Sequence, residues 1–363
     1  MRRGVALMIE SDGPGGAEQM VVELAEELRR RGFGVCPVGP AQGSGWLPQQ
    51  LRSRGFDPEV FRLRRPVDPA CVFDLRRTLE RRGVSVIHSH EFTMAVYGTA
   101  VARMLGVPHV ITMHGGRGYQ ASWRRRVALR WACRRSTSVG VSKSAAHALE
   151  HSLRLAPGSV RVVLNGIRFA PGDRVRGRAV LGLDSETPLI LAVGNLYPVK
   201  GHIYLLRALR RLVDAHPDLK WHAAIAGRGG EESALREYLS ASTLTDRVTL
   251  LGYREDVPDL LAAADIYAMP SLSEGMPLAL IEAMFARKAI VASLVGGIPE
   301  VVSAGREALL VPPEDPEALV EALGELLRDP ARRAALAGAA EGRARAEYDV
   351  AAMADAYERL YWG

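Results

Sequence analysis

The chain has 363 residues, more than one hydrophobic core usually serves, so we expect two domains. No apolar run approaches the roughly 20 residues that span a bilayer, and the first apolar run is too short for a signal peptide. The three cysteines are scattered, which argues against disulfides and a zinc site and favours a cytoplasmic protein. Residues 1–170 carry 26 Lys and Arg against 13 Asp and Glu, so this half is expected to meet an anionic partner. Nucleic acid is not expected, because no DNA- or RNA-binding motif is present.

The chain begins with a strand, a glycine-rich turn and a helix. Residues 4–9 are a short apolar run, and residues 17–31 repeat apolar side chains with helical period. The turn between them contains Gly13, Gly15 and Gly16. This order is typical of folds that hold a phosphate at a helix N-terminus, although such turns also serve tight packing alone.

Strands and helices alternate through the rest of the first half. Such alternation predicts a parallel sheet with helices on both faces. The predicted strands are residues 34–38, 59–63, 84–88, 109–112 and 136–140, and the predicted helices are residues 68–82, 92–105 and 120–134.

Three histidines stand at the ends of predicted strands, where α/β folds place functional groups. His88 and His90 end one strand, and His114 follows another, directly before two glycines. A histidine at such a place is often only packed, and this is what we expect for His88. His90 stays open between packing and substrate contact, whereas we expect a functional role for His114.

Arginine and tryptophan dominate residues 118–135. A basic helix with aromatic residues can lie on an anionic membrane surface. The same segment can equally be a solvated basic face over a buried stripe of Val127 and Trp131. The sequence leaves both readings open, and with them peripheral contact with the inner face of a membrane.

Residues 171–187 are rich in proline, glycine and charge and are predicted to be a linker. After this linker, the second half shows the same alternation of strands and helices as the first. We expect Asp256 to cap a helix over residues 257–263. Lys200 stands among glycines, where a compact cation can bind a diphosphate. Predicted strands lie at residues 189–193, 221–226, 248–251, 265–269 and 289–292.

Residues 270–286 combine a turn with a helix start. Pro277 suits the first helical turn, whose free N–H groups form an anion site. Glu274 precedes the helix and Glu282 lies about one and a half turns inside it. A positive helix end beside two carboxylates suits a phosphate that also carries hydroxyl groups. The stretch therefore predicts a site for a nucleotide sugar.

Four motifs of the second half resemble those of the retaining glycosyltransferases of family 4. They are Gly-Asn-Leu-x-Pro-Val-Lys-Gly from residue 194, Gly-Tyr-Arg-Glu-Asp-Val from residue 252, Pro-Ser-x-Ser-Glu-Gly-Met-Pro-Leu from residue 270 and Gly-Gly-Ile-Pro-Glu from residue 296. The resemblance implies the GT-B fold, an α/β fold of two Rossmann-like, doubly wound parallel-sheet domains that face each other across a deep cleft. It implies an acceptor-binding domain at 1–170, a nucleotide-sugar-binding domain at 188–344, and a terminal helix at about 345–363 that packs back on the first domain.

The resemblance also implies the activity. We expect a retaining hexosyltransferase that moves a sugar from a nucleotide sugar, UDP-linked before GDP-linked, to a hydroxyl group of a glycan, a lipid-linked or a small-molecule acceptor. Neither a metal nor another cofactor is expected, because no acidic cluster of metal-ligand type lies near these loops. The implied catalytic residues are His114, Lys200 and Glu274. The implied donor-binding residues are Gly15, Gly16, Asn195, Lys200, Gly227, Arg228, Tyr253, Arg254, Glu274, Gly275, Met276, Pro277, Leu278 and Glu282.

The acceptor is less well defined. The resemblance places its contacts in loops around residues 40–56, 91–94 and 115–123, with His90 and Arg117 as candidates. Two positions depart from the family pattern. Asn195 stands where an arginine is usual, and Arg168 stands where an acid is usual, so the donor site has one cation fewer unless Arg228 or Arg254 compensates.

Two other classes of function remain as alternatives. One is a sugar-nucleotide epimerase or a phosphorylase of the same fold, which would need other acid/base residues or a pyridoxal lysine. The other is a non-catalytic module that binds nucleotide sugars, and only Asn195 and Arg168, which depart from the family pattern, support it. The sequence names neither the sugar nor the acceptor.

Overall fold

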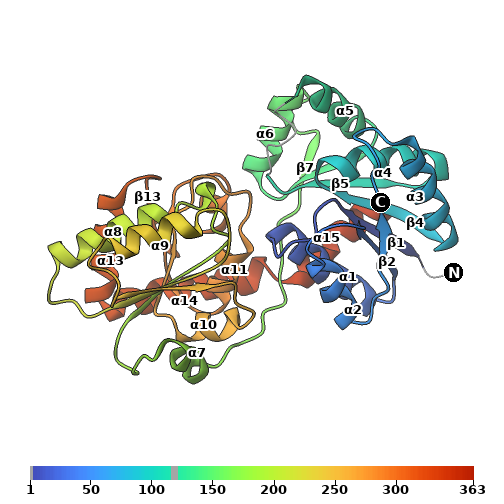
Figure 1. Ribbon diagram of the computed structural model, residues 1–363. Coiled ribbons are helices and arrows are strands. Elements are labelled where there is room, and N and C mark those ends of the chain that lie inside the picture. Colours follow the sequence, from blue (N-terminus) through green and yellow to red (C-terminus); the bar gives the residue numbers. More distant parts are fainter. Residues whose placement is uncertain (1–2, 116–121) are drawn as a thin grey trace. The chain divides into compact units, whose positions relative to one another are not determined.

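The structure is a computed structural model that describes residues 3–115 and 122–363. The chain forms two compact units, coloured by sequence in Figure 1. Unit 1 consists of Met1–Arg168 together with Asp349–Gly363, and unit 2 is Phe169–Tyr348. Both ends of the chain therefore belong to unit 1.

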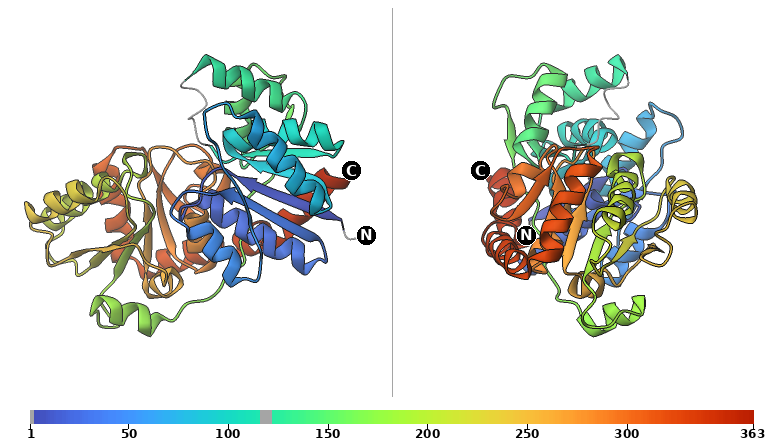
Figure 2. Two further views of the ribbon diagram at one scale, coloured as in Figure 1. Left: turned by 45° about the vertical axis from the view of Figure 1, so that its right-hand side comes forward. Right: turned by 90° about the vertical axis from the view of Figure 1, so that its left-hand side faces the viewer.

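Unit 1 is built on a seven-stranded parallel sheet in the order β3-β2-β1-β4-β5-β6-β7. Helices cover both faces of this sheet (Figure 2). The central strands are apolar and buried on both sides, as the strands of a covered parallel sheet must be. The strands are β1 Gly4–Ile9, β2 Gly34–Pro40, β3 Glu59–Phe61, β4 Val84–His90, β5 His109–Met113, β6 Thr137–Gly140 and β7 Val160–Val162. The helices are α1 Gly16–Arg30, α2 Trp46–Ser53, α3 Pro69–Arg81, α4 Glu91–Leu105, α5 Trp123–Cys133, α6 Lys143–Leu153 and α15 Val350–Trp362.

The last helix, α15, packs against α1 and closes unit 1. Arg31, which caps α1, donates to the carboxylates of Asp355 and Glu358 at 2.5 and 2.6 Å. The backbone of Val350 donates to the carbonyl oxygen of Ile167 at 3.1 Å, so the two points at which the chain crosses between units lie side by side.

Unit 2 has a six-stranded parallel sheet in the order β10-β9-β8-β11-β12-β13. Strand order reverses beside β8, where open α/β sheets place their ligands at the carboxyl ends of the strands. The strands are β8 Leu189–Val193, β9 His222–Ala226, β10 Val248–Gly252, β11 Ile266–Met269, β12 Ala289–Ser293 and β13 Ala308–Val311. The helices are α7 Arg174–Leu181, the 3₁₀ turn η2 Pro198–Lys200, α8 His202–Ala215, α9 Glu232–Ser240, α10 Val257–Ala263, α11 Leu278–Phe285, α12 Ile298–Val301, α13 Pro316–Arg328 and α14 Pro330–Glu347.

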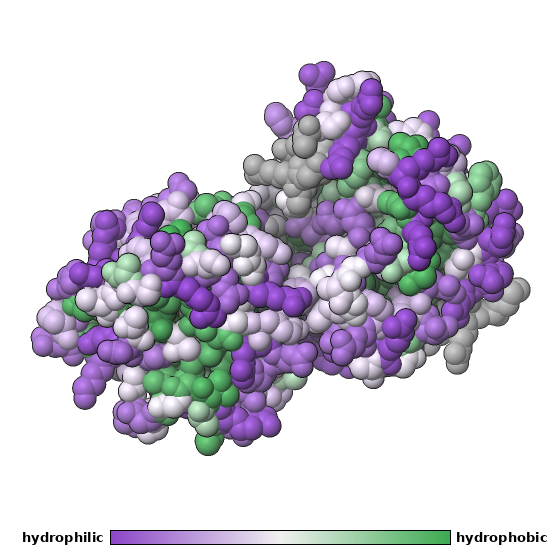
Figure 3. Space-filling view, viewed as in Figure 1, coloured by the Kyte–Doolittle hydropathy of each residue, from purple (hydrophilic) through white to green (hydrophobic). Residues whose placement is uncertain are grey.

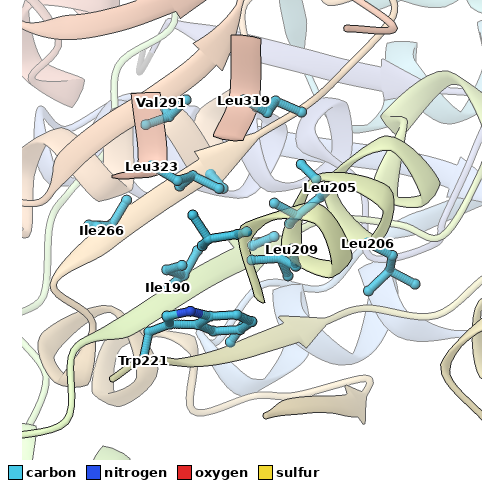
Figure 4. Close-up of a cluster of buried hydrophobic side chains, with 14 of the residues drawn as sticks. Ile190, Leu205, Leu206, Leu209, Trp221, Ile266, Val291, Leu319 and Leu323 are labelled. Carbon is cyan, nitrogen blue, oxygen red and sulfur yellow. The ribbon is translucent and has the colours of Figure 1, made fainter. Parts of the chain in front are cut away.

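The core of unit 2 lies between this sheet and the helices α8 and α13 (Figure 4). Leu205 and Leu209 of α8 meet Leu319 and Leu323 of α13, and Ile190 of β8 lies beneath them. The apolar faces of both helices repeat every three to four residues, which places the leucines on one side. This core fixes the end of the sheet at which the carboxyl termini of the strands lie, called here the carboxyl edge, and the site loops begin there.

The predicted linker is wrong in part, because residues 174–181 fold as α7. Asp173 caps this helix by accepting hydrogen bonds from the backbone of Val175 and Arg176. α7 packs on α10, and a β-carbon on Gly177 would lie 2.1 Å from the carbonyl oxygen of Asp259. The glycine and charges that suggested a linker therefore serve a close helix contact.

Two local expectations also need correction. Pro277 occupies the N-cap of α11 instead of its first turn. Asp256 precedes α10, but its carboxylate does not cap the helix and instead binds Arg254. No helix among the described residues is both long and apolar enough to cross a bilayer.

Candidate functional site

The loops at the carboxyl edge of the unit 2 sheet are tied to one another by backbone contacts. The backbone of Leu272 donates to the carbonyl of Val199 at 2.8 Å, which joins the loops after β11 and β8. Gly201 has φ +66, and a β-carbon there would lie 2.0 Å from the carbonyl oxygen of Pro270. Only glycine therefore allows the Lys200 turn to approach the residues that precede α11.

An ion pair forms the centre of this edge. Lys200 Nζ lies 2.8 and 3.0 Å from Oε1 and Oε2 of Glu274, and Ser271 Oγ donates to Glu274 Oε1 at 2.6 Å. The side chain of Glu274 is buried, whereas that of Lys200 is partly exposed. The loop after β12 supports Glu274 from behind, because the backbone of Gly297 donates to its carbonyl oxygen at 3.1 Å.

Glu282 lies on α11, which begins without a side-chain cap. The N–H groups at its start are therefore not saturated by a capping side chain, and the macrodipole makes this end positive. Burial raises the pKa of Tyr267 well above its usual value, and the nearby carboxylates of Glu282 and Glu274 add to this rise. Both carboxylates thus act electrostatically on the same buried tyrosine.

The loops after β9 and β10 form the other side of the edge. Gly227 stands where a β-carbon would lie 1.8 Å from the carbonyl oxygen of Gly194, and the backbone of Leu196 donates to the carbonyl of Arg228 at 2.9 Å. The Arg228 guanidinium stacks 4.9 Å from the ring centroid of Tyr253.

The two arginines proposed to compensate for Asn195 differ in their surroundings. Arg254 makes a forked pair with Asp256 at 2.7 and 2.5 Å, which occupies its guanidinium. Arg228 is exposed and enters no ion pair among the described residues. Only Arg228 therefore has a guanidinium that is not already committed to a carboxylate.

In unit 1, two histidines lie together at the carboxyl ends of β4 and β5. His114 Nε2 is 3.0 Å from His90 Nδ1, and one of these nitrogens donates to the other. Burial lowers the pKa of His114 to about 4, so its imidazole is neutral at physiological pH. His90 is 0% exposed, and its Nε2 has no partner among the described residues. His90 therefore supports His114, and its contact with an acceptor stays a prediction.

His88 is packed, as expected. Its Nδ1 lies 2.6 Å from the hydroxyl of Tyr361 and its Nε2 lies 2.8 Å from Thr112 Oγ1. Thr112 also lies 3.0 Å from the hydroxyl of Tyr357. The last helix therefore fixes the strand ends that carry the other two histidines.

Gly15 and Gly16 form the start of α1, with Gly15 as N-cap and no side-chain cap. The first turn of α1 thus offers backbone donors at the same edge of the unit 1 sheet.

Arg168, which departs from the family pattern, donates to the buried carboxylate of Glu27 at 3.0 Å and serves the packing of unit 1. Arg117 lies outside the described residues. Among those described, no group of three or more His, Cys, Asp or Glu is placed to hold a metal ion.

Comparison with known proteins decides the family. Residues 187–329 match the profile described as Glycosyl transferases group 1, and residues 14–170 match Glycosyltransferase Family 4. The chain is 30% identical to the alpha-maltose-1-phosphate synthase of Mycolicibacterium smegmatis, with 98% of each chain covered. The chain belongs to glycosyltransferase family 4.

Other similarities agree with this family. The D-inositol 3-phosphate glycosyltransferase of Saccharomonospora viridis is 29% identical, with 95% of this chain and 82% of that protein covered. The crystal structure of Anabaena HepE in complex with UDP-glucose superposes with a TM-score of 0.85 at 24% identity, over 98% of each chain. The sucrose-phosphate synthase of Thermosynechococcus elongatus gives a TM-score of 0.83 at 22% identity, over 99% and 98%. The predicted family and GT-B fold are confirmed.

Within this family 4 glycosyltransferase, the structure brings together the predicted Lys200 and Glu274, and separately His90 and His114. Sequence reasoning missed Ser271, which supports Glu274, and did not single out Glu91, whose carboxylate accepts from the backbone of His114 at 3.1 Å. Both lie within two residues of a strand end, and this position is the signal that could have found them. The roles of the individual residues stay predictions.

Proposed function

We propose that the protein is a retaining hexosyltransferase that moves a sugar from a nucleotide sugar, UDP-linked in preference to GDP-linked, to a hydroxyl group of an acceptor. The observation that carries the proposal is the Lys200–Glu274 pair held at the start of α11, with Glu282 on the same helix. A diphosphate needs cationic and N–H donors, and sugar hydroxyls need carboxylate acceptors. The HepE structure with UDP-glucose supports this type of donor.

Each residue then has a distinct task. Lys200 and the N–H groups at the start of α11 stabilise the negative charge that grows on the leaving diphosphate. Glu282 accepts hydrogen bonds from the ribose hydroxyls, and Glu274 accepts from the hydroxyls of the transferred sugar and orients its anomeric carbon. His114, neutral and anchored by His90, offers a polar contact to the donor sugar. Gly15 and Gly16 supply backbone N–H groups to the diphosphate.

Retention follows in this proposal from attack on the face that the diphosphate leaves. The acceptor oxygen forms a bond to the anomeric carbon while the bond from that carbon to the phosphate oxygen breaks. The acceptor proton passes to the leaving phosphate oxygen, so no enzyme nucleophile is required. Because Lys200 and helix N–H groups supply the positive charge, we propose that no metal is needed.

The acceptor is proposed to carry negative charge. The excess of Lys and Arg in residues 1–170 supports this choice. The names of two relatives, an alpha-maltose-1-phosphate synthase and a D-inositol 3-phosphate glycosyltransferase, contain phosphorylated polyols, which makes such molecules the first acceptors to test. A phosphate on a glycan or lipid-linked acceptor offers the same chemistry.

We further propose that α5 contacts an anionic membrane surface. Trp123 and Val127 are 64% and 58% exposed and lie one turn apart on the same face of the helix. The alternative stripe of buried Val127 and Trp131 is therefore wrong for Val127. No acidic residue lies within residues 122–135, and strongly hydrophilic side chains dominate this part of unit 1 at the top of Figure 3. Exposed aromatic and basic residues together favour an interfacial position.

A thermal-shift screen of UDP, GDP and their sugars, with and without EDTA, tests the donor site. A ligand at 100 times its dissociation constant adds about 2.7 kcal/mol of stability, which is readily measured. We expect UDP and a UDP-sugar to raise the melting temperature in EDTA, the Glu282→Gln variant to lose this rise, and the exposed control Glu321→Gln on α13 to keep it. No rise with any nucleotide would refute the donor site, and a rise that needs a divalent metal would refute the metal-free mechanism.

Product analysis separates transfer from the alternatives. NMR of the product made from the stabilising donor should show a new glycoside with the anomeric configuration of the donor. An inverted glycoside would overturn retention, an epimerised nucleotide sugar would indicate an epimerase, and nucleotide binding without turnover would indicate a binding module.

A further inference from the structure

Glu91 adopts a backbone conformation that its residue type disfavours. It begins α4 directly after β4 and has φ +64, whereas His90 before it is extended. Left-handed backbone is strained for a residue with a side chain of this kind, and glycine would avoid this strain. Arg154 shares a positive φ, but it ends α6, where this conformation is common. The position of Glu91 therefore requires another explanation.

The carboxylate of Glu91 is also poorly compensated. Its Oε1 accepts from the backbone N–H of His114 at 3.1 Å, which is its one hydrogen bond within residues 3–115 and 122–363. A carboxylate can accept about four. The pKa of Glu91 is raised to about 7, mainly by burial, and the nearby carboxylates of Glu10 and Glu18 contribute to this rise instead of offsetting the burial. The site thus combines a strained backbone with a desolvated acid.

A purely structural role would not need this acid. The N–H of His114 requires only a neutral acceptor, and Oε2 of Glu91 accepts no hydrogen bond within residues 3–115 and 122–363. Strain and an uncompensated carboxylate at the carboxyl edge of a parallel sheet are what a binding residue retains at a cost in stability.

We propose that Glu91 positions the acceptor of the transfer reaction by accepting hydrogen bonds from its hydroxyl groups beside His114. The chemical class recognised is a polyol or sugar with vicinal hydroxyl groups, because one carboxylate oxygen remains for them while the other is held by the His114 backbone. The inference rests on the proposed function and adds to it the residue that selects and orients the acceptor. No proton transfer to Glu91 is required.

The test compares Glu91→Gln with a matched control, Glu150→Gln. Glu150 is a buried glutamate of unit 1 whose carboxylate, like that of Glu91, accepts a backbone N–H from another element, that of Val160 at 3.0 Å. Both amides keep an oxygen for this hydrogen bond. Glucose 1-phosphate, myo-inositol 3-phosphate and water serve as acceptors, with UDP-glucose or the donor identified by thermal shift.

We expect Glu91→Gln to lower kcat/KM for the reactive acceptor at least tenfold, mainly through KM, while the donor-induced thermal shift stays unchanged. Glu150→Gln should alter neither. Donor hydrolysis should stay unchanged, because water has no vicinal hydroxyl groups for Glu91 to hold, and an equal fall in hydrolysis would overturn the acceptor role. Equal kinetics of Glu91→Gln and the wild type, or loss of the donor-induced shift, would overturn the acceptor role alone. A wild type that cleaves no donor would overturn the proposed function and this inference with it.

Discussion

The ammonium group of Lys200 contacts both carboxylate oxygens of Glu274, at 2.8 and 3.0 Å, in the loops that precede α8 and α11. The two residues are separated by 74 positions, so the pair fixes two strand-end loops in one geometry. Each partner orients the other, and the loss of either leaves a partly buried charge without its counterion. The ion pair therefore links the proposed phosphate contact to the proposed sugar contact.

Removal of the Lys200 charge should reduce turnover without unfolding the protein. We expect Lys200→Gln to lower kcat about 10²–10³-fold, the usual effect of losing one charge-stabilising donor in a transition state. The exposed Lys220→Gln in the same unit is the control. Steady-state rates with a saturating donor measure the effect, and a loss below threefold would show that Lys200 does not stabilise the leaving group.

Gly296 should tolerate no side chain, both because of its positive φ and because a β-carbon would collide with a neighbouring carbonyl oxygen. A second glycine with a positive φ but open space around it separates these two effects. Gly296 has φ +51, and a β-carbon would lie 1.9 Å from the carbonyl oxygen of Glu274. Gly182 has φ +64 with open space around it. We expect Gly182→Ala to cost about 1 kcal/mol through the backbone alone. Gly296→Ala should cost more in urea unfolding and should also reduce activity, because it displaces Glu274. Equal costs and full activity would show that the loop adapts.

Glu91 should make stability fall as pH rises. Its folded pKa of about 7 exceeds the ordinary 4.5, so between these values the folded state holds a proton that the unfolded state has lost. Across this window the wild type should lose up to about 3 kcal/mol more than Glu91→Gln, at 1.36 kcal/mol per unit. Glu10, Glu18 and His114 face position 91 in both proteins, so the difference between the two curves reports the carboxylate of Glu91. Urea unfolding at pH 5 and pH 8 measures the difference, and parallel curves would contradict the raised pKa.

The proposed membrane contact of α5 should depend on both its charge and its tryptophan. We expect the triple variant Trp123→Ala, Arg124→Gln, Arg126→Gln to lose sedimentation with phosphatidylcholine vesicles that contain phosphatidylglycerol. The control is Phe73→Ala with Arg77→Gln on α3, which also presents an exposed aromatic residue but has Asp74 beside it. Binding of the wild type should weaken at high salt. Equal binding to neutral vesicles, or equal loss in the control, would refute the contact.

The sequence predicted those parts of the structure whose signal is local. The apolar runs of β1, β8 and β12 are recognisable because parallel strands are buried on both faces. The strand-end position of His114 and the helix formers after Pro277 were equally visible. α7 was missed because its stability comes from contacts with α10, which composition does not reveal.

Among the site residues, too, the sequence predicted local features and missed contacts between distant segments. Glu274 and Lys200 were recognisable from their motifs, but nothing in the sequence shows that they form an ion pair across 74 residues. Asp256 satisfied the rule for a helix cap, yet Arg254 two residues earlier outcompetes the backbone N–H groups for its carboxylate. The burial of His90 and the positive φ of Glu91 depend on how β4 meets α4, which only the folded chain determines.

The side-by-side crossings near Ile167 and Asp349 have a consequence for the topology of the polypeptide. Because the chain leaves unit 1 and re-enters it at adjacent points, unit 2 is an insertion with neighbouring ends, and unit 1 is split in sequence but continuous in space. A short glycine linker from Arg168 to Asp349 would therefore make unit 1 a single continuous polypeptide. We expect that unit 1 joined in this way and unit 2 can be produced as separate proteins.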